Sequence, residues 1–170
     1  ANETAQDIMT QGGRSLAIRC DVSDPVAAKS LIARVEQEWG RIDVLINGAG
    51  PYHRINLFDE TVDGWNEMFD GNLHPIFYLA QAVAPGMKAR KTGRIINFSM
   101  ANADQMEAQP DVTGHYIAKA GVLILTRTLA KLLAPYGATV NAISDTISVA
   151  DVIEAVDEPT QTRARRVVHA

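Results

Sequence analysis

Four short apolar runs are spread along the chain, each of a length typical of a strand. They are residues 15–20, 43–47, 93–98 and 138–143. Most positions within each run are apolar, with little of the alternation that marks a strand with one face in water. Runs of this kind are typical of strands buried on both faces of a parallel sheet.

The segments between these runs place apolar residues three and four positions apart, the spacing of one helix face. Asp24 and Pro25 begin one such segment, because an Asp side chain caps a helix and a proline at its first position loses no hydrogen bond. This helix is predicted to run to about Trp39 and to end at Gly40. The other predicted helices are residues 2–11, 61–90 with a candidate break near Pro75, and 115–133.

Strands that alternate with helices form a parallel sheet covered by helices on both faces. The sequence therefore predicts an α/β fold with three layers. The 170 residues are enough for one domain with a substantial core.

Composition and charge narrow the classes of function. Charged residues make up 21% of the chain and the net charge is −4, so no excess of positive charge favours nucleic acid or an anionic membrane. Cys20 is the only cysteine, which excludes an internal disulfide. No run approaches the roughly 20 apolar residues of a membrane helix, and no secretion signal is recognisable at the N-terminus. We expect a cytoplasmic protein, and no histidine spacing predicts a metal site.

Five motifs follow one another along residues 2–148. They are CDVSD at 20–24, RIDVLINGAG at 41–50, GNLHPIFYLAQAVAPGM at 71–87, GRIINFS at 93–99 and HYIAKAGVLILTRTLAKLLAPYGATVNAI at 115–143. Each motif alone is weak, but their order resembles that of the short-chain dehydrogenase/reductase family. The resemblance implies a Rossmann-like parallel sheet and an NAD(P)-dependent oxidoreductase. Such an enzyme moves a hydride between nicotinamide and a carbonyl or alcohol substrate.

The same resemblance implies that the family fold is incomplete here and truncated at both ends. The family begins with a strand, a Gly-rich phosphate loop, a helix and a second strand, which have no counterpart in this sequence, and its last strand is also expected to be missing. Residues 1–148 would be a partial dinucleotide-binding Rossmann-like domain, followed by a short helix and polar tail at 149–170. We expect weak dinucleotide binding. The choice between NAD and NADP is unreadable, because it is made at the end of the missing second strand.

The resemblance assigns catalytic roles to Asn72, Ser99, Tyr116 and Lys119. A tyrosine has a reference pKa of about 10, so a nearby lysine and the charged nicotinamide would be needed to favour its phenolate as the acid/base group. The serine hydroxyl would steady the substrate oxygen. The asparagine would hold a water molecule on the proton path.

Cofactor contacts are implied for residues beyond the carboxyl ends of the strands, where ligands bind in such sheets. They are Asp21, Val22, Asn47, Ala49, Gly50, Tyr116 and Lys119. Alternatives remain for several of these positions. Asp21 could only cap a turn, Ser99 could only cap a loop, and Asn102 or Asp104 could replace it.

Three departures from the family pattern concern the chemistry. The family's serine usually stands where this chain has Met100, and the loop after residue 143 lacks the usual Pro-Gly. Tyr116 and Lys119 are three residues apart instead of four, so His115 occupies the family's tyrosine position. We expect Tyr116 to be the acid/base, brought over the site by one tightened 3₁₀ turn. His115 is the alternative, because its imidazole titrates near neutral pH.

A function of another class also fits: a non-catalytic truncated homologue that acts as an oligomerising module. In the family, the helices that match residues 61–90 and 115–133 build the subunit interface. The second of these helices carries more apolar residues than one buried stripe needs. They include Val122, Leu123, Leu125, Leu129, Leu132 and Leu133. We therefore expect a homo-oligomer with a small-molecule carbonyl or alcohol substrate, and no nucleic-acid or membrane partner.

Overall fold

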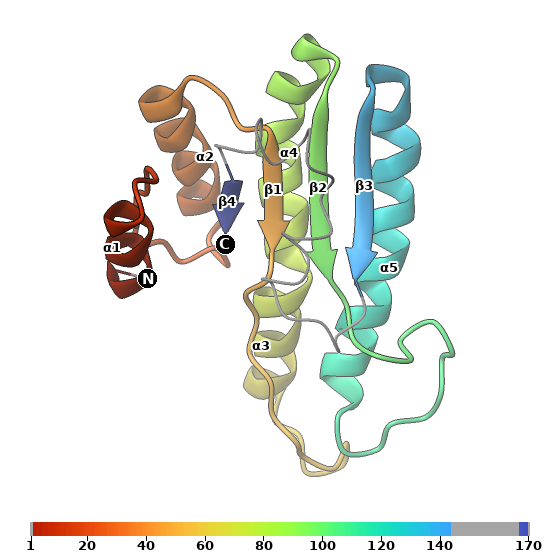
Figure 1. The fold of residues 1–170 in the computed structure, drawn as a ribbon. Helices are drawn as coiled ribbons and strands as arrows, with labels where there is room; N and C mark the ends of the chain where they lie inside the picture. Colours follow the sequence, from red (N-terminus) through yellow and green to blue (C-terminus); the bar gives the residue numbers. More distant parts are fainter. Residues whose placement is uncertain (1, 144–166, 170) are drawn as a thin grey trace.

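The computed structural model describes residues 2–143 and 167–169 and contains one parallel sheet (Figure 1). Its strands lie in the order β3-β2-β1-β4, and each neighbouring pair is parallel. The strands are β1 (Val44–Asn47), β2 (Gly93–Phe98), β3 (Ala138–Ile143) and β4 (Val167–His169). The predicted α/β class with a Rossmann-like parallel sheet is confirmed.

The helices follow the predicted alternation with the strands. They are α1 (Asn2–Thr10), α2 (Pro25–Trp39), α3 (Val62–Asn72), α4 (His74–Arg90) and α5 (Thr113–Leu133), followed by the 3₁₀ turn η1 (Ala134–Tyr136). The Asp24 carboxylate accepts the Val26 amide at 2.8 Å, and Gly40 ends α2 in the left-handed region with φ 82°. The long helical segment breaks at Leu73, near Pro75 as predicted. None of the described helices is long and apolar enough to cross a membrane.

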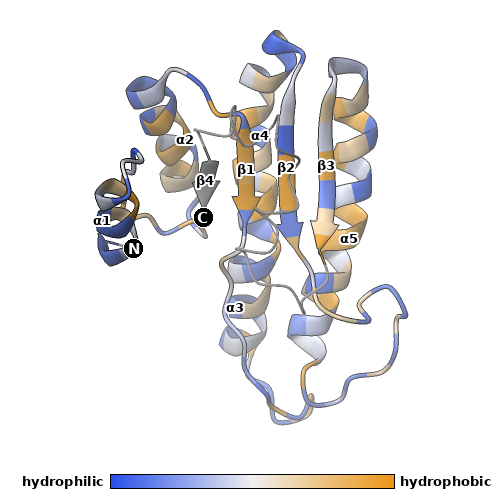
Figure 2. Ribbon diagram, in the orientation of Figure 1, coloured by the Kyte–Doolittle hydropathy of each residue, from blue (hydrophilic) through white to orange (hydrophobic). Residues whose placement is uncertain are grey.

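The main core lies between the sheet and helices α2, α4 and α5, which cover one of its faces (Figure 1). Leu45 and Ile95 of the strands pack there against α2 and α4. Neighbouring strand residues point to the opposite face, where Ile46 and Ile96 belong to a second, smaller cluster. Figure 2 shows the continuous apolar stretch along β1 and the adjoining part of β2. Both faces of the central strands are therefore apolar, as the unalternating runs predicted.

The predicted strand at residues 15–20 is wrong, because this segment has no regular secondary structure. Ile18 and Cys20 still pack against the main core, whereas the side chain of Leu16 is exposed to solvent. Only residues 18–20, with exposed Arg19 between the two packed side chains, alternate as they would in a strand, because Leu16 would share their face. A strand also needs a partner for its backbone groups, and none of the described strands lies beside this segment.

Strand β4 was not predicted, because residues 167–169 were expected to belong to a polar tail. It pairs with β1 on the side away from β2, with Leu45 opposite Val168. The expected helix near residues 149–156 and the changed loop after residue 143 lie outside the described residues. The division of the chain at 148/149 stays a prediction.

Candidate active site

Two loops leave the sheet side by side at the carboxyl ends of β1 and β2. The last residue of β1, Asn47, is opposite Asn97 in the parallel register, so both loops start at the same edge. Further out, the loops are joined by backbone hydrogen bonds from Ile55 to the Asp111 carbonyl at 2.8 Å and from Leu57 to the Pro110 carbonyl at 2.9 Å. These contacts bring segments about fifty residues apart in sequence to one place.

Ser99 and Lys119 meet at this edge. The Ser99 hydroxyl donates to the Lys119 carbonyl at 2.9 Å, and the Lys119 ammonium donates to the Phe98 carbonyl at 3.0 Å. The Ser99 amide donates to the Ile143 carbonyl at 2.9 Å. Both side chains are buried. The ends of β2 and β3 are thereby tied to the first turns of α5.

The phenol of Tyr116 points to the loop that follows Ser99. Its hydroxyl donates to the Asn102 carbonyl and accepts from the Glu107 amide at 3.2 Å. The expected tightened turn is absent, because the Tyr116 amide bonds the Val112 carbonyl four residues back, the α-helical pattern. The structure therefore places Tyr116 against the 102–107 loop, and Asn102 contributes its backbone rather than its side chain.

His115 lies one helical turn before Lys119 on the same face of α5, since residues four apart share a helix face. It is buried, and its ring meets Tyr52 edge-on, with ring centroids 5.0 Å apart and planes at 89°. Sequence analysis did not single out Tyr52. The available signal was an aromatic residue two positions beyond Gly50, at the end of the β1 motif.

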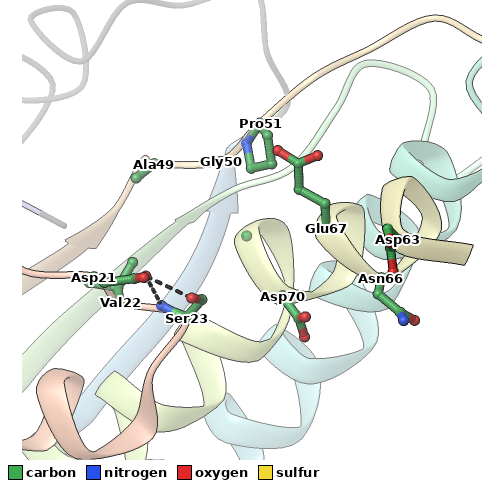
Figure 3. A pocket seen from close by; sticks show the side chains of 11 residues that line it. Asp21, Val22, Ser23, Ala49, Gly50, Pro51, Asp63, Asn66, Glu67 and Asp70 are labelled. Carbon is green, nitrogen blue, oxygen red and sulfur yellow. Dashed lines mark hydrogen bonds between the residues drawn. The ribbon is translucent and has the colours of Figure 1, made fainter.

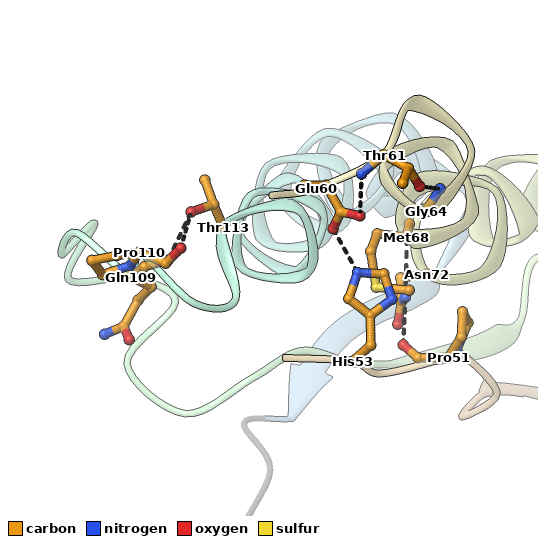
Figure 4. A network of polar contacts seen from close by, with 10 residues as sticks. All are labelled: Pro51, His53, Glu60, Thr61, Gly64, Met68, Asn72, Gln109, Pro110 and Thr113. Carbon is orange, nitrogen blue, oxygen red and sulfur yellow. Dashed lines mark hydrogen bonds and ion pairs between the residues drawn. The ribbon is translucent and has the colours of Figure 1, made fainter. Parts of the chain in front are cut away.

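Asn72 holds the loop that leaves β1 (Figure 4). Its amide nitrogen donates to the carbonyls of Pro51 at 2.9 Å and Met68 at 3.0 Å. Its amide oxygen is buried and has no hydrogen-bond partner among the described residues. A Cβ at Gly50 would stand 2.3 Å from that oxygen, so only glycine allows this approach. A buried acceptor of this kind suits a donor such as water.

Asn47 points away from the candidate chemistry and into the helix-covered face of the sheet. It donates to the Asn97 amide oxygen at 2.7 Å, and Asn97 donates to the Thr126 hydroxyl at 2.9 Å. All three side chains are buried. Sequence analysis missed this network, although polar residues at the ends of two apolar runs were a usable signal.

A cavity of about 640 Å³ lies between the 21–23 turn, the start of the loop after β1, and α3 (Figure 3). Its volume falls within the range of small-molecule sites, and it is broadly open to solvent. It is lined by Asp21, Val22, Ser23, Ala49, Gly50, Pro51, Asp63, Asn66, Glu67, Asp70 and Gly71. Four predicted cofactor residues, Asp21, Val22, Ala49 and Gly50, are therefore brought together, whereas Asn47, Tyr116 and Lys119 are not part of its lining.

Asp21 is exposed and also caps its own turn, as the alternative assignment expected. Its carboxylate accepts the Ser23 hydroxyl at 2.6 Å and the Ser23 amide at 3.0 Å. These two hydrogen bonds, the hydroxyl first, hold the pKa of the Asp21 carboxyl below its ordinary value. Burial, followed by the charges of Asp21 and Asp24, raises the pKa of the Cys20 thiol. Across the described residues, no group of three or more His, Cys, Asp or Glu side chains could hold a metal ion.

The sequence and the fold both match a known family. The family model described as Enoyl-(Acyl carrier protein) reductase matches residues 1–169. The chain is 33% identical over 154 residues to a 3-oxoacyl-[acyl-carrier-protein] reductase of Synechocystis sp.. The aligned residues make up 91% of this chain and 62% of that relative. The chain belongs to the short-chain dehydrogenase/reductase family. It spans about three fifths of the length of this curated relative.

Solved structures support the same assignment. A short chain dehydrogenase from Mycobacterium smegmatis superposes with a TM-score of 0.82 and 26% identity, covering 99% of this chain and 75% of that one. A gluconate 5-dehydrogenase from Burkholderia cenocepacia J2315, solved with NADP and tartrate, gives a TM-score of 0.77 and 30% identity, covering 84% of this chain and 55% of that one.

Proposed function

We propose that the protein is an NAD(P)-dependent oxidoreductase that moves a hydride between nicotinamide and a small carbonyl or alcohol substrate. The observation that carries the proposal is a pair of contacts at the carboxyl end of β2: the Ser99 hydroxyl donates to the Lys119 carbonyl, and the Lys119 ammonium donates to the Phe98 carbonyl. They support a site at this edge, because ligands bind beyond the carboxyl ends of the strands in sheets of this type. The proposal includes a cytoplasmic location and assembly into a homo-oligomer.

The cavity supports a nucleotide cofactor. Asp21 and Val22 form one wall, Ala49 and Gly50 another, and its volume is adequate for the adenosine part of a dinucleotide. Gly50 has no room for a side chain, which lets the backbone form that wall. A nicotinamide cofactor would supply or accept the hydride. NADP is present in the related gluconate 5-dehydrogenase structure, and the residues of this cavity do not select between NAD and NADP.

The chain's own residues would orient the substrate and move the proton. The Ser99 hydroxyl would turn from the Lys119 carbonyl to donate to the substrate oxygen. Tyr116 would exchange a proton with that oxygen after releasing the Asn102 carbonyl, and the Lys119 charge would favour its phenolate. The amide oxygen of Asn72, which has no hydrogen-bond partner among the described residues, would hold a water molecule from which protons are resupplied.

The test is reduced-nicotinamide oxidation in the presence of small ketones, with cofactor at high concentration. Replacing Lys119 by Met should lower the rate by about 100-fold or more, the range of general acid–base catalysis. Lys131→Met, at the exposed end of the same helix, is the matched control and should leave the rate unchanged. Cofactor oxidation that is equal in both variants would refute the proposed site.

The second candidate function is an oligomerising module without catalysis. It is favoured by large apolar side chains that are exposed on α4 and α5, namely Phe77, Ile117, Ile124 and Leu132. A protein with no cofactor-dependent turnover that nevertheless self-associates would fit this candidate instead.

A further inference from the structure

The loop that carries Tyr52 is held on both sides of this residue (Figure 4). On one side the Pro51 carbonyl accepts the Asn72 amide at 2.9 Å. On the other, the His53 imidazole contacts the Glu60 carboxylate at 2.6 Å. The Ile55 amide then bonds the neighbouring loop at Asp111. The backbone around Tyr52 is therefore held by α3, by the loop after β2 and by a contact within its own loop.

The side chain of Tyr52 is 56% exposed although its backbone is held in this way. The edge contact with His115 holds the Tyr52 ring on one side, and much of this ring is still open to solvent. An aromatic side chain has only two rotatable bonds, so little conformational entropy is lost when a ligand packs on it. A fixed, open aromatic ring is well suited to bind a flat apolar group.

Tyr52 also lies at the junction of the two halves of the candidate site. It directly follows residues 49–51, which line the cavity. Its partner His115 is one helical turn before Lys119, whose carbonyl accepts the Ser99 hydroxyl. Tyr52 therefore lies between the residues that line the cavity and the turn of α5 that leads to Lys119.

We propose that Tyr52 determines substrate specificity by packing on an aromatic group attached to the reacting carbonyl carbon. His115 is the positioning residue that sets the orientation of the Tyr52 ring. The substrate class is then aryl ketones and the corresponding secondary alcohols. This inference rests on the proposed function, because it names the substrate of the same site.

The experiment compares two ketones that differ only in aromaticity, acetophenone and cyclohexyl methyl ketone. Their dissociation constants for the full chain are measured by NMR titration, which needs no turnover. The wild-type protein should favour acetophenone. Tyr52→Ala should lower this preference about fivefold, the equivalent of the roughly 1 kcal/mol that an aromatic pair contributes. Tyr52→Phe should retain it, as should the control Tyr136→Ala, which removes an exposed aromatic from η1.

The two His115 variants test the positioning role. His115→Phe keeps an aromatic edge against Tyr52 and should keep the preference for acetophenone, whereas His115→Ala should lower it as Tyr52→Ala does. An unchanged ratio in Tyr52→Ala, an equal loss for both ketones, or no binding of either ketone to the wild-type protein would overturn the inference. A ratio that depends on Tyr52 without any hydride transfer would instead refute the proposed function and leave the binding role of Tyr52 standing.

Discussion

Ser99, Tyr116 and Lys119 each use a polar side-chain atom to hold backbone in this structure. Ser99 bonds the Lys119 carbonyl, Lys119 bonds the Phe98 carbonyl, and Tyr116 bonds the 102–107 loop. The single donor of the Tyr116 phenol is already used in the bond to the Asn102 carbonyl, and its oxygen also accepts from the Glu107 amide. For Tyr116, contact with a substrate oxygen would replace a bond to the loop. Catalysis by Tyr116 would therefore be coupled to the order of that loop.

The first prediction separates Tyr116 from His115 as the acid/base. Tyr116→Phe should lower ketone reduction by about 100-fold or more, whereas His115→Ala should retain most of the maximal rate at saturating substrate. The physical reason is reach, because an imidazole is shorter than a phenol and would stop short of the substrate oxygen. The measurement is the maximal rate as a function of pH for both variants. A His115 variant that loses activity while the Phe variant keeps it would reverse the assignment.

The family resemblance assigned Ser99 and Lys119 to one site, and the two residues are in contact in the structure. It did not predict the contact between Tyr52 and His115, because that contact depends on the path of an irregular loop held by Asn72 and by Glu60. The cofactor contact of Asn47 stays a prediction, and its side chain donates to the Asn97 amide oxygen. The direction in which a residue points at the last position of a strand depends on the register, which the apolar pattern alone left open.

Three elements are joined by the buried chain of Asn47, Asn97 and Thr126. Asn47 ends β1, Asn97 lies near the end of β2, and Thr126 is in the middle of α5. Inside a low-dielectric core, buried hydrogen bonds of this kind favour one arrangement of their elements, because a shift would leave further polar groups unpaired beside the Asn47 amide oxygen, which has no partner among the described residues. The network thus fixes α5, which carries Tyr116 and Lys119, relative to the strand ends.

The second prediction concerns this network. Asn97→Ala would leave the Asn47 amide and the Thr126 hydroxyl without this partner, and it should reduce the free energy of unfolding by about 2–4 kcal/mol. The matched control is Asn141→Ala on β3, where the side chain is exposed, and it should cost less than about 0.5 kcal/mol. Urea denaturation of both variants gives the comparison. Equal losses would show that the network adds no stability.

The fold was predictable wherever an element contains its own signals. Helix α2 has both a cap and a stop, in Asp24 and Gly40, and it formed at the predicted residues. Residues 15–20 have an apolar composition but no neighbouring strand, so composition alone gave the wrong element. Strand β4 was missed because a three-residue strand carries little local pattern. It is defined by its pairing with β1.

For the whole molecule, the charge around the cavity bears on cofactor affinity. Four carboxylates line the cavity, from Asp21, Asp63, Glu67 and Asp70, and no lysine or arginine does. A pyrophosphate group needs backbone amides, a helix N-terminus or cations, and the 170 residues contain no Gly-rich phosphate loop. These residues therefore offer a bound dinucleotide no cation for its phosphates.

The third prediction is that the 170-residue chain binds dinucleotides weakly. Calorimetric titrations with NAD, NADH, NADP and NADPH should each give a dissociation constant weaker than micromolar. Adenosine serves as the control and should bind about as well as NAD, because the phosphates add no favourable contact. Micromolar binding of any of the four dinucleotides would show that the phosphates find a binding site within these residues.

The apolar surface of α5 bears on assembly. Of the residues expected to exceed one buried stripe, Val122 and Leu133 are buried in the structure, whereas Leu132 is 59% exposed. Ile124, in the middle of the same helix, is 57% exposed. Large apolar side chains left open on one helix favour association through that helix.

The last prediction is that the chain self-associates through this surface of α5. Sedimentation velocity at tens of micromolar should show a dimer or a larger species, because association removes Ile124 and Leu132 from water. Ile124→Asp should shift the protein to monomer, since it would bury an unpaired carboxylate in the interface. Val26→Asp on α2 is the matched control, because Val26 is 71% exposed and lies on a different helix; it should leave the sedimentation profile unchanged. A wild-type protein that sediments as a clean monomer would contradict the prediction, and equal dissociation by both variants would place the interface elsewhere.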